Sequence, residues 1–240
     1  MRMKRTVTIV LGLLMAAGLM AQQQEQMGGL GFQIGYASPT LRINSPTSKN
    51  LEGIPMNGLK VGLNYDATIV KGFGTTLGLN YTYGTYYSQW EDVSAMSTDQ
   101  KRYRDTYQGI EIFCDWQYKF EIAGETYLIL YSGPSIQCHL MLKEQEYIRT
   151  AEGTTSQRTR DGYKYRNNES FEDYKRLNVT WGVGAGFQYK RYFLRGGYDF
   201  GLINPYKKDT FRALGVDSDL YTRGRFDQWH IKIGMYLWRN

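Results

Sequence analysis

The sequence predicts an all-β fold, an antiparallel up-and-down transmembrane β-barrel of about eight strands. Three observations predict it. Eight segments alternate apolar and polar residues with a period of two, and the connections between them alternate between short and long. After the first 21 residues, no apolar stretch is long enough to span a membrane as a helix. Because backbone groups exposed to lipid must be hydrogen-bonded within the protein, a membrane chain without such helices has to close into a barrel.

The N-terminus has the pattern of an export signal. Basic residues lie within 2–5, an apolar stretch covers 6–17, and small residues precede a polar run that starts after Ala21. We therefore expect cleavage after Ala21 and a single barrel domain over 22–240. An uncleaved membrane anchor is the alternative, but the apolar stretch is shorter than the ~20 residues that a spanning helix needs.

Charge, cysteine content and motifs argue against several classes of function. Three of the 29 basic residues lie in the signal, which leaves 26 against 23 acidic residues, and no basic stripe predicts a nucleic-acid partner. Cys114 and Cys138 fall on the two strands of one expected hairpin, where Cys114 faces a residue near Gly133, so we expect no disulfide. Neither a metal-ligand spacing nor a phosphate-binding glycine loop is found, so no metal or cofactor is expected.

The expected strands are read from the alternation. In the clearest segment, 177–188, the odd-numbered residues are apolar and the even-numbered ones are Asn, Thr, Gly or Gln. Pro134 interrupts one of the strands, where we expect a bulge, because proline cannot donate a ladder hydrogen bond. The eight expected strands are 30–37, 59–67, 76–83, 109–119, 128–140, 177–188, 192–201 and 229–237.

The connections between the strands predict how the barrel is oriented. In a meander every second connection emerges at the same end, so short turns share one end and long loops the other. Transmembrane barrels place short turns on the periplasmic side and long loops outside. The short connections are 70–74, 121–125 and 190–191, and the long ones are 38–57, 87–106, 143–175 and 205–225.

The apolar face of the strands is expected to meet lipid, and the polar face to fill a narrow interior. Glycines and small amides suit a crowded interior, and aromatic residues near the strand ends suit interfacial girdles. A soluble lipocalin-like barrel is the alternative.

With about eight strands the interior is filled by side chains, so a plug is expected and a narrow channel is a weaker alternative. We expect a structural network of paired interior charges formed by Lys60, Asp66, Glu111, Asp115, Lys119, Arg195, Asp199 and Lys232.

Several segments resemble the outer-membrane β-barrel domain proteins of Bacteroidetes, which are described as porin-like or PorT-like. They are the glutamines that follow the signal, the Gly-Phe-Gln-Ile-Gly segment at 31–35, Gly-Pro-Ser at 133–135 and Ile-Gly-Met-Tyr-Leu at 233–237. The resemblance covers nearly the whole mature chain. It implies export to the cell outer membrane and contact with the barrel-insertion machinery during assembly. The terminal aromatic signal of such barrels is displaced here, because two residues follow Trp238.

The two histidines are the candidates for a catalytic role. His139 and His230 fall on the polar face toward the extracellular end, in the zone of Asp227, Glu144 and Ser135, where a histidine beside an acid can act as a general base. The spacings match no known barrel enzyme, and we expect both histidines at a wet rim. The protein is therefore predicted to be non-enzymatic, with a lipid A-modifying enzyme as an alternative.

The long loops carry the remaining chemistry. Their basic residues suit the phosphates of lipopolysaccharide, and loops on a rigid scaffold suit partner or ligand binding. We predict an outer-membrane barrel that serves envelope integrity or partner binding, with a PorT-like component of a protein secretion machine as the first alternative. An envelope protein is thus a further expected partner beside outer-membrane lipid. The candidate contacts to lipopolysaccharide or a partner are Arg149, Arg158, Arg160, Lys164, Arg166, Lys207 and Lys208.

Overall fold

The computed structural model describes an all-β chain. The described residues are 28–44, 51–70, 72–93, 98–150, 152–161, 175–205 and 224–239. Their strands are β1 (Gly28–Asn44), β2 (Leu51–Pro55), β3 (Asn57–Val70), β4 (Phe73–Tyr87), β5 (Glu91–Asp92), β6 (Gln100–Ala123), β7 (Thr126–Thr150), β8 (Gly153–Asp161), β9 (Leu177–Tyr189), β10 (Tyr192–Gly201) and β11 (Gly224–Arg239). The export signal predicted at 1–21 lies outside the described residues.

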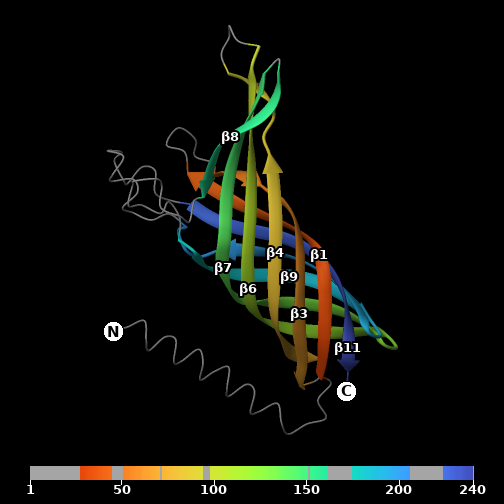
Figure 1. The fold of residues 1–240 in the computed structure, drawn as a ribbon. Helices are drawn as coiled ribbons and strands as arrows, with labels where there is room; N and C mark the ends of the chain where they lie inside the picture. Colours follow the sequence, from red (N-terminus) through yellow and green to blue (C-terminus); the bar gives the residue numbers. More distant parts are fainter. Residues whose placement is uncertain are drawn as a thin grey trace, which may run out of the picture.

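Eight of these strands pair side by side until the first meets the last. The order around the ring is β6, β4, β3, β1, β11, β10, β9 and β7, and β7 pairs with β6 to close it (Figure 1). All of these pairings are antiparallel. The predicted up-and-down barrel of about eight strands is therefore confirmed. Each of the remaining strands, β2, β5 and β8, pairs with one ring strand.

The two faces of the ring differ sharply in polarity. On β9, the outward Val183 keeps 43% of its surface exposed, whereas the inward Thr180 is fully buried. The same contrast holds around the ring, with large apolar side chains outside and amides, hydroxyls and charges inside. A lipocalin-like barrel would need the opposite arrangement, so this alternative is excluded. In the described part of the chain, no helix is long and apolar enough to cross a membrane.

The short turns, the start of β1 and the end of β11 share one end of the barrel. Gly124 and Glu125 join β6 to β7, and Lys190 and Arg191 join β9 to β10. Gly124 has a φ of 47° and Lys190 a φ of 52°, the left-handed backbone that such tight turns require. The antiparallel order puts the start of β1 and the end of β11 at this same end, which by the loop-length rule faces the periplasm.

At the other end, β6 and β7 continue well beyond the ring. They stay paired from Gln100 opposite Arg149 down to the turn, and β8 pairs with the upper part of β7. Figure 1 shows this hairpin rising above the barrel. The prediction that 87–106 and 143–175 are loops was therefore wrong for 100–106, 143–150 and 153–161. Alternation of apolar and polar residues reveals a strand only where one face of the strand meets an apolar environment. The chain here is polar on both faces.

Pro134 does not produce the expected bulge. The pairs Phe113–Ser135 and Trp116–Ser132 on either side of it keep one register, and the register shifts of this hairpin lie elsewhere. The proline therefore interrupts the ladder without an inserted residue. Cys114 and Cys138 are free thiols, as predicted, because Cys138 lies opposite Ile110 instead.

Candidate functional site

The lower half of the interior is organised around Asp66. Its carboxylate accepts a hydrogen bond from Lys119 Nζ at 2.8 Å and pairs with Arg195 Nη2 at 3.2 Å. The hydroxyls of Thr76 and Tyr236 also donate to it. Arg195 reaches Gln117 Oε1 as well, at 2.9 Å. Two cations and two hydroxyls from four different strands thus converge on one buried carboxylate of a fifth.

A second cluster lies around Lys60, which is fully buried. Its Nζ donates to Glu111 Oε2 at 2.9 Å and to Gln228 Oε1 at 2.7 Å, and lies 3.8 Å from Asp199 Oδ2. His230 Nδ1 lies 3.2 Å from the same Asp199 oxygen. Asn80 and Gln137 donate to the Glu111 carboxylate. The cluster therefore links strands on opposite sides of the ring.

The remaining two charges of the expected interior network, Asp115 and Lys232, are also buried. Lys232 Nζ lies 5.2 Å from the centroid of the Phe113 ring. Together with the two clusters, they give four cations and four carboxylates inside the ring. Such balance limits the cost of burying charge.

An apolar layer closes the extracellular mouth above these charges. Leu41, Met56, Tyr107 and Phe226 are buried against one another, with the half-buried Tyr86 and Leu142 packed beside them. Polar clusters fill the space below this layer.

Both histidines lie deeper than predicted. His139 is 1% exposed and packs 4.5 Å from the Phe226 ring, while His230 is 4% exposed and contacts Tyr131 Oη at 3.3 Å. The expectation of a wet rim was therefore wrong, because the apolar layer covers the mouth. Asp227, one of the acids considered beside them, is instead held by Arg42 at 2.9 Å and Arg225 at 2.8 Å.

Outside the ring, arginines and aromatic rings stack on the outer face of the extended hairpin. The Arg102 guanidinium carbon lies 4.6 Å from the Trp90 ring centroid and 5.1 Å from that of Tyr87. Arg104 lies 5.4 Å from Tyr87, and Arg149 lies 4.4 Å from Trp90. These distances are in the range of cation–π interactions. We define the arginine–aromatic face as Tyr87, Trp90, Arg102, Arg104, Tyr147 and Arg149.

Strand register explains why these residues share a side. Arg104 lies opposite Tyr87 on β4, and Arg102 lies opposite Tyr147 on β7. On β6, the even-numbered residues continue the row of Ile110, which faces lipid. The arginine–aromatic face is therefore the upward continuation of the lipid-facing surface.

The acidic residues of the hairpin occupy the opposite side. Asp105 lies opposite Glu144, and Tyr103 Oη donates to Glu146 Oε1 at 3.4 Å. Burial, followed by the nearby Glu144 charge, raises the pKa of Asp105 to about 6. These three carboxylates therefore lie on the face of the hairpin opposite to the arginine–aromatic face.

The three arginines of the arginine–aromatic face have no carboxylate partner within 4 Å in the described part of the chain. The hydrogen bond that the Arg104 guanidinium donates to the Tyr147 hydroxyl raises the pKa of Arg104, so its charge is fixed. Rings that stack on a guanidinium leave its in-plane N–H donors free for a planar or tetrahedral anion. Guanidinium groups arranged in this way have the chemistry to bind an anion.

The comparisons agree with this architecture. Residues 20–206 match the family described as "Outer membrane protein beta-barrel domain". The chain belongs to this outer-membrane β-barrel family. Membership places the barrel in the outer membrane, whereas the narrower PorT-like resemblance stays a prediction.

Three solved structures are similar to this chain at low sequence identity and low TM-score. Ail, the attachment invasion locus protein of Yersinia pestis, solved with the heparin analogue sucrose octasulfate, is 13% identical (TM-score 0.38; 87% of this chain, 98% of that one). Neisserial surface protein A is 9% identical (TM-score 0.40; 89% and 100%). The translocator domain of NalP from Neisseria meningitidis is 7% identical (TM-score 0.34; 98% and 97%). A search of curated proteins finds no match.

Only some of the predicted contacts to lipopolysaccharide or a partner lie in the part of the chain that the structure describes. Arg149 belongs to the arginine–aromatic face. Arg158 and Arg160 lie in β8, opposite Glu146 and Glu144, and their side chains lie outside the described residues. Lys164, Arg166, Lys207 and Lys208 also lie outside the described residues.

Sequence reasoning missed the other members of this face. Arg102 and Arg104 were assigned to a loop, together with Tyr87 and Trp90. The signal that could have found them is the Arg-Tyr-Arg spacing at 102–104, which puts two guanidinium groups on one side of any strand.

Proposed function

We propose that this protein is a non-enzymatic outer-membrane barrel that binds the phosphate groups of lipopolysaccharide through its arginine–aromatic face. The observation that carries this proposal is the set of three arginines without carboxylate partners, stacked on aromatic rings on one side of the extended hairpin. Arginine pairs with phosphate through parallel, charge-assisted hydrogen bonds, which are the strong ones.

The height of the face above the membrane supports this ligand. The exposed apolar band on β6 begins at Ile110, and Arg104 lies six residues beyond it. At ~3.3 Å per residue, this is roughly 20 Å along the tilted strand. The face therefore stands over the polar region of the outer leaflet, beside molecules that lie against the barrel wall. Anionic sugars and phosphates occupy that region of a lipopolysaccharide layer.

The closed interior supports a role at the surface. The apolar layer at the mouth and the two charge clusters leave the extended hairpin as the part of the described chain available to an external ligand. Burial of both histidines argues against hydrolysis of lipid A, because no lipid bond can reach them.

The test is binding of phosphorylated rough-type lipopolysaccharide to the purified barrel, compared with the same preparation after chemical dephosphorylation. We expect the triple variant R102Q/R104Q/R149Q to bind the phosphorylated form at least tenfold more weakly, because hydrogen bonds to charged groups contribute ~1.5–3 kcal/mol each. Dephosphorylation should weaken binding by the wild type to the same extent.

Two controls make the result specific. Lys101→Gln removes one charge near the tip of the same hairpin and should leave binding unchanged. R102K/R104K/R149K keeps the charge but loses the planar fork, so its affinity should be intermediate. Equal binding of both lipopolysaccharide preparations by the wild type would contradict the proposal. An envelope protein that co-purifies with the wild type and not with the triple glutamine variant would instead assign the face to a protein partner.

A further inference from the structure

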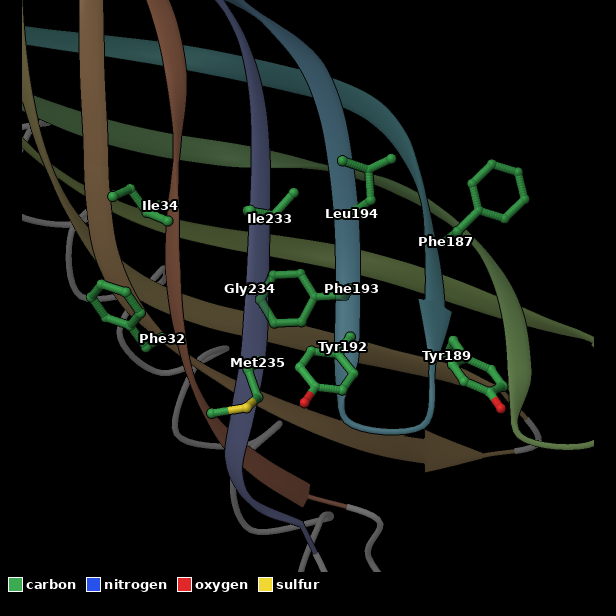
Figure 2. A pocket seen from close by; sticks show the side chains of 10 residues that line it. All are labelled: Phe32, Ile34, Phe187, Tyr189, Tyr192, Phe193, Leu194, Ile233, Gly234 and Met235. Atoms are coloured by element: carbon green, nitrogen blue, oxygen red, sulfur yellow. The ribbon is translucent and has the colours of Figure 1, made fainter.

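A groove runs across the outside of the barrel near its periplasmic end. Two rows of outward side chains border it, each row crossing β1, β11, β10 and β9 in register. Figure 2 shows both rows and the space between them. The upper row is Ile34, Ile233, Leu194 and Phe187, and the lower row is Phe32, Met235, Tyr192 and Tyr189.

The floor of the groove lies between the two rows. At Gly234 the floor is bare backbone, and the Phe193 ring packs directly beneath it from inside the barrel. A methyl group added to Gly234 would come within 2.2 Å of that ring. The groove has a volume of about 490 Å³ and is lined by apolar side chains. Its shape is therefore fixed by the sheet and by a buried ring.

One end of the groove is polar and positively charged. Tyr189 and Tyr192 flank the turn between β9 and β10, and in Figure 2 their hydroxyls point toward the turn end of the barrel. The two residues of the turn, Lys190 and Arg191, are both exposed. The Lys190 ammonium lies 5.4 Å from the centroid of the Tyr189 ring. Cations and tyrosine hydroxyls at this level meet the headgroups of the periplasmic leaflet.

We infer that this groove is a binding site for one anionic phospholipid of the periplasmic leaflet. One acyl chain lies between the two rows of side chains, and the phosphate of the headgroup lies at Lys190 and Arg191. Two features select this occupant: the apolar groove has the chemistry of an acyl chain, and the pair of cations at its end complements a net negative headgroup. The inference does not depend on the proposed function, because the two sites lie at opposite ends of the barrel.

A second groove on the barrel provides an internal comparison. It lies against β3, β4 and β6, has a volume of about 220 Å³ and is lined by Val61, Leu63, Leu79, Tyr81 and Ile110. It is apolar like the first, but it lies along the middle of its strands, away from the turns. Lipid in this groove is expected to exchange without headgroup preference.

The experiment is native mass spectrometry of the folded barrel in detergent, titrated with dioleoylphosphatidylglycerol or dioleoylphosphatidylcholine. We expect one phosphatidylglycerol to be retained about tenfold more tightly than phosphatidylcholine. K190N/R191Q should reduce phosphatidylglycerol retention about tenfold, to the phosphatidylcholine level. Asparagine is chosen for Lys190 because it tolerates the left-handed backbone of that position.

The second variant tests the groove itself. Ile233→Trp fills the space between the rows and should lower retention of the same lipid, whereas Leu63→Trp in the smaller groove should not. Heat-modifiable gel mobility checks that each variant is a closed barrel. Equal retention of the two lipids by the wild type, or unchanged phosphatidylglycerol retention in either K190N/R191Q or Ile233→Trp, would overturn the inference. So would a dimer that displaces the lipid, since the occupant would then be a second copy of the chain.

Discussion

Asp105 and Glu144 lie directly opposite each other on β6 and β7, in the part of the hairpin that rises above the lipid-facing band. Burial and the facing carboxylate raise the pKa of Asp105 from its ordinary value of 3.8 to about 6. The folded hairpin therefore holds this proton more tightly than the unfolded chain does. Its contribution to stability is full below pH 4 and is lost as the pH rises through 6.

We expect Asp105→Asn to stabilise the extended hairpin at pH 7.5 by about 1 kcal/mol, a figure reduced for the solvent screening of a partly exposed pair. At pH 4 the substitution should have little effect, because the wild-type carboxyl is then protonated. Hydrogen exchange of the amides at 100–107 measures both states. Glu121→Gln, at the other end of the same hairpin, is the control. A stabilisation of equal size at both pH values would show that charge repulsion is not the cause.

Removal of a cation from the Asp66 cluster should destabilise the barrel strongly. Arg195→Gln leaves the buried Asp66 with Lys119 as its remaining paired cation. We expect a loss of about 3–5 kcal/mol in the free energy of unfolding, measured by urea titration in lipid vesicles. The double variant D66N/R195Q removes both charges and should recover part of that loss. If the double variant is less stable than Arg195→Gln, the ion pair is not the source of the effect.

The apolar layer at the mouth should contribute to stability without being the sole barrier to ions. Phe226→Ala removes the most buried ring of that layer. We expect a loss of about 3–5 kcal/mol in unfolding free energy. Planar-bilayer recordings should show no stable conductance for the wild type or this variant, because the Lys60 cluster fills the interior below. A steady conductance in the variant alone would show that the apolar layer is what blocks the passage of ions through the wild-type barrel.

Glycines of the barrel wall differ in the space around them, and the inward-facing Gly184 can be compared with the outward-facing Gly196. A Cβ at Gly184 would lie 2.2 Å from the Tyr131 ring, whereas at Gly196 its nearest neighbour would be 3.8 Å away. We expect Gly184→Ala to cost about 1–3 kcal/mol through overpacking, and Gly196→Ala to be nearly neutral. Thermal shifts in gel mobility compare the two. Similar losses at both positions would point to backbone effects in place of ring contact.

The sequence was most informative where the ring crosses the membrane. Residues such as Val183 and Thr180 differ in polarity because one meets lipid and the other meets the interior, so alternation identifies the strand and its faces together. The eight charged residues assigned to the interior all lie inside the ring, and seven of them are buried, with Lys119 slightly exposed.

Two aspects could not be read from alternation. Both faces of the extended hairpin carry polar residues. Arg102 and Asp105 therefore produce no alternation of polar and apolar residues, even though they lie on opposite sides of β6. The partners inside the ring depend on its curvature. Lys60 reaches Gln228, 168 positions away, because closure brings distant strands across one narrow interior. No local pattern encodes such a pairing.

The first and last strands that the structure describes run alongside each other, since β1 and β11 are neighbours in the ring and pair from Gly29–Arg239 to Ile43–Gly224. We call the β1–β11 pairing the seam of the barrel, and it has a consequence for how the barrel is assembled. The wall is incomplete until the last strand arrives, so a chain shortened by one strand leaves two unpaired edges in the lipid, each with unsatisfied backbone groups. A circular permutant that joins these ends and opens the Lys190–Arg191 turn keeps every pairing of the wall while moving the seam between β9 and β10.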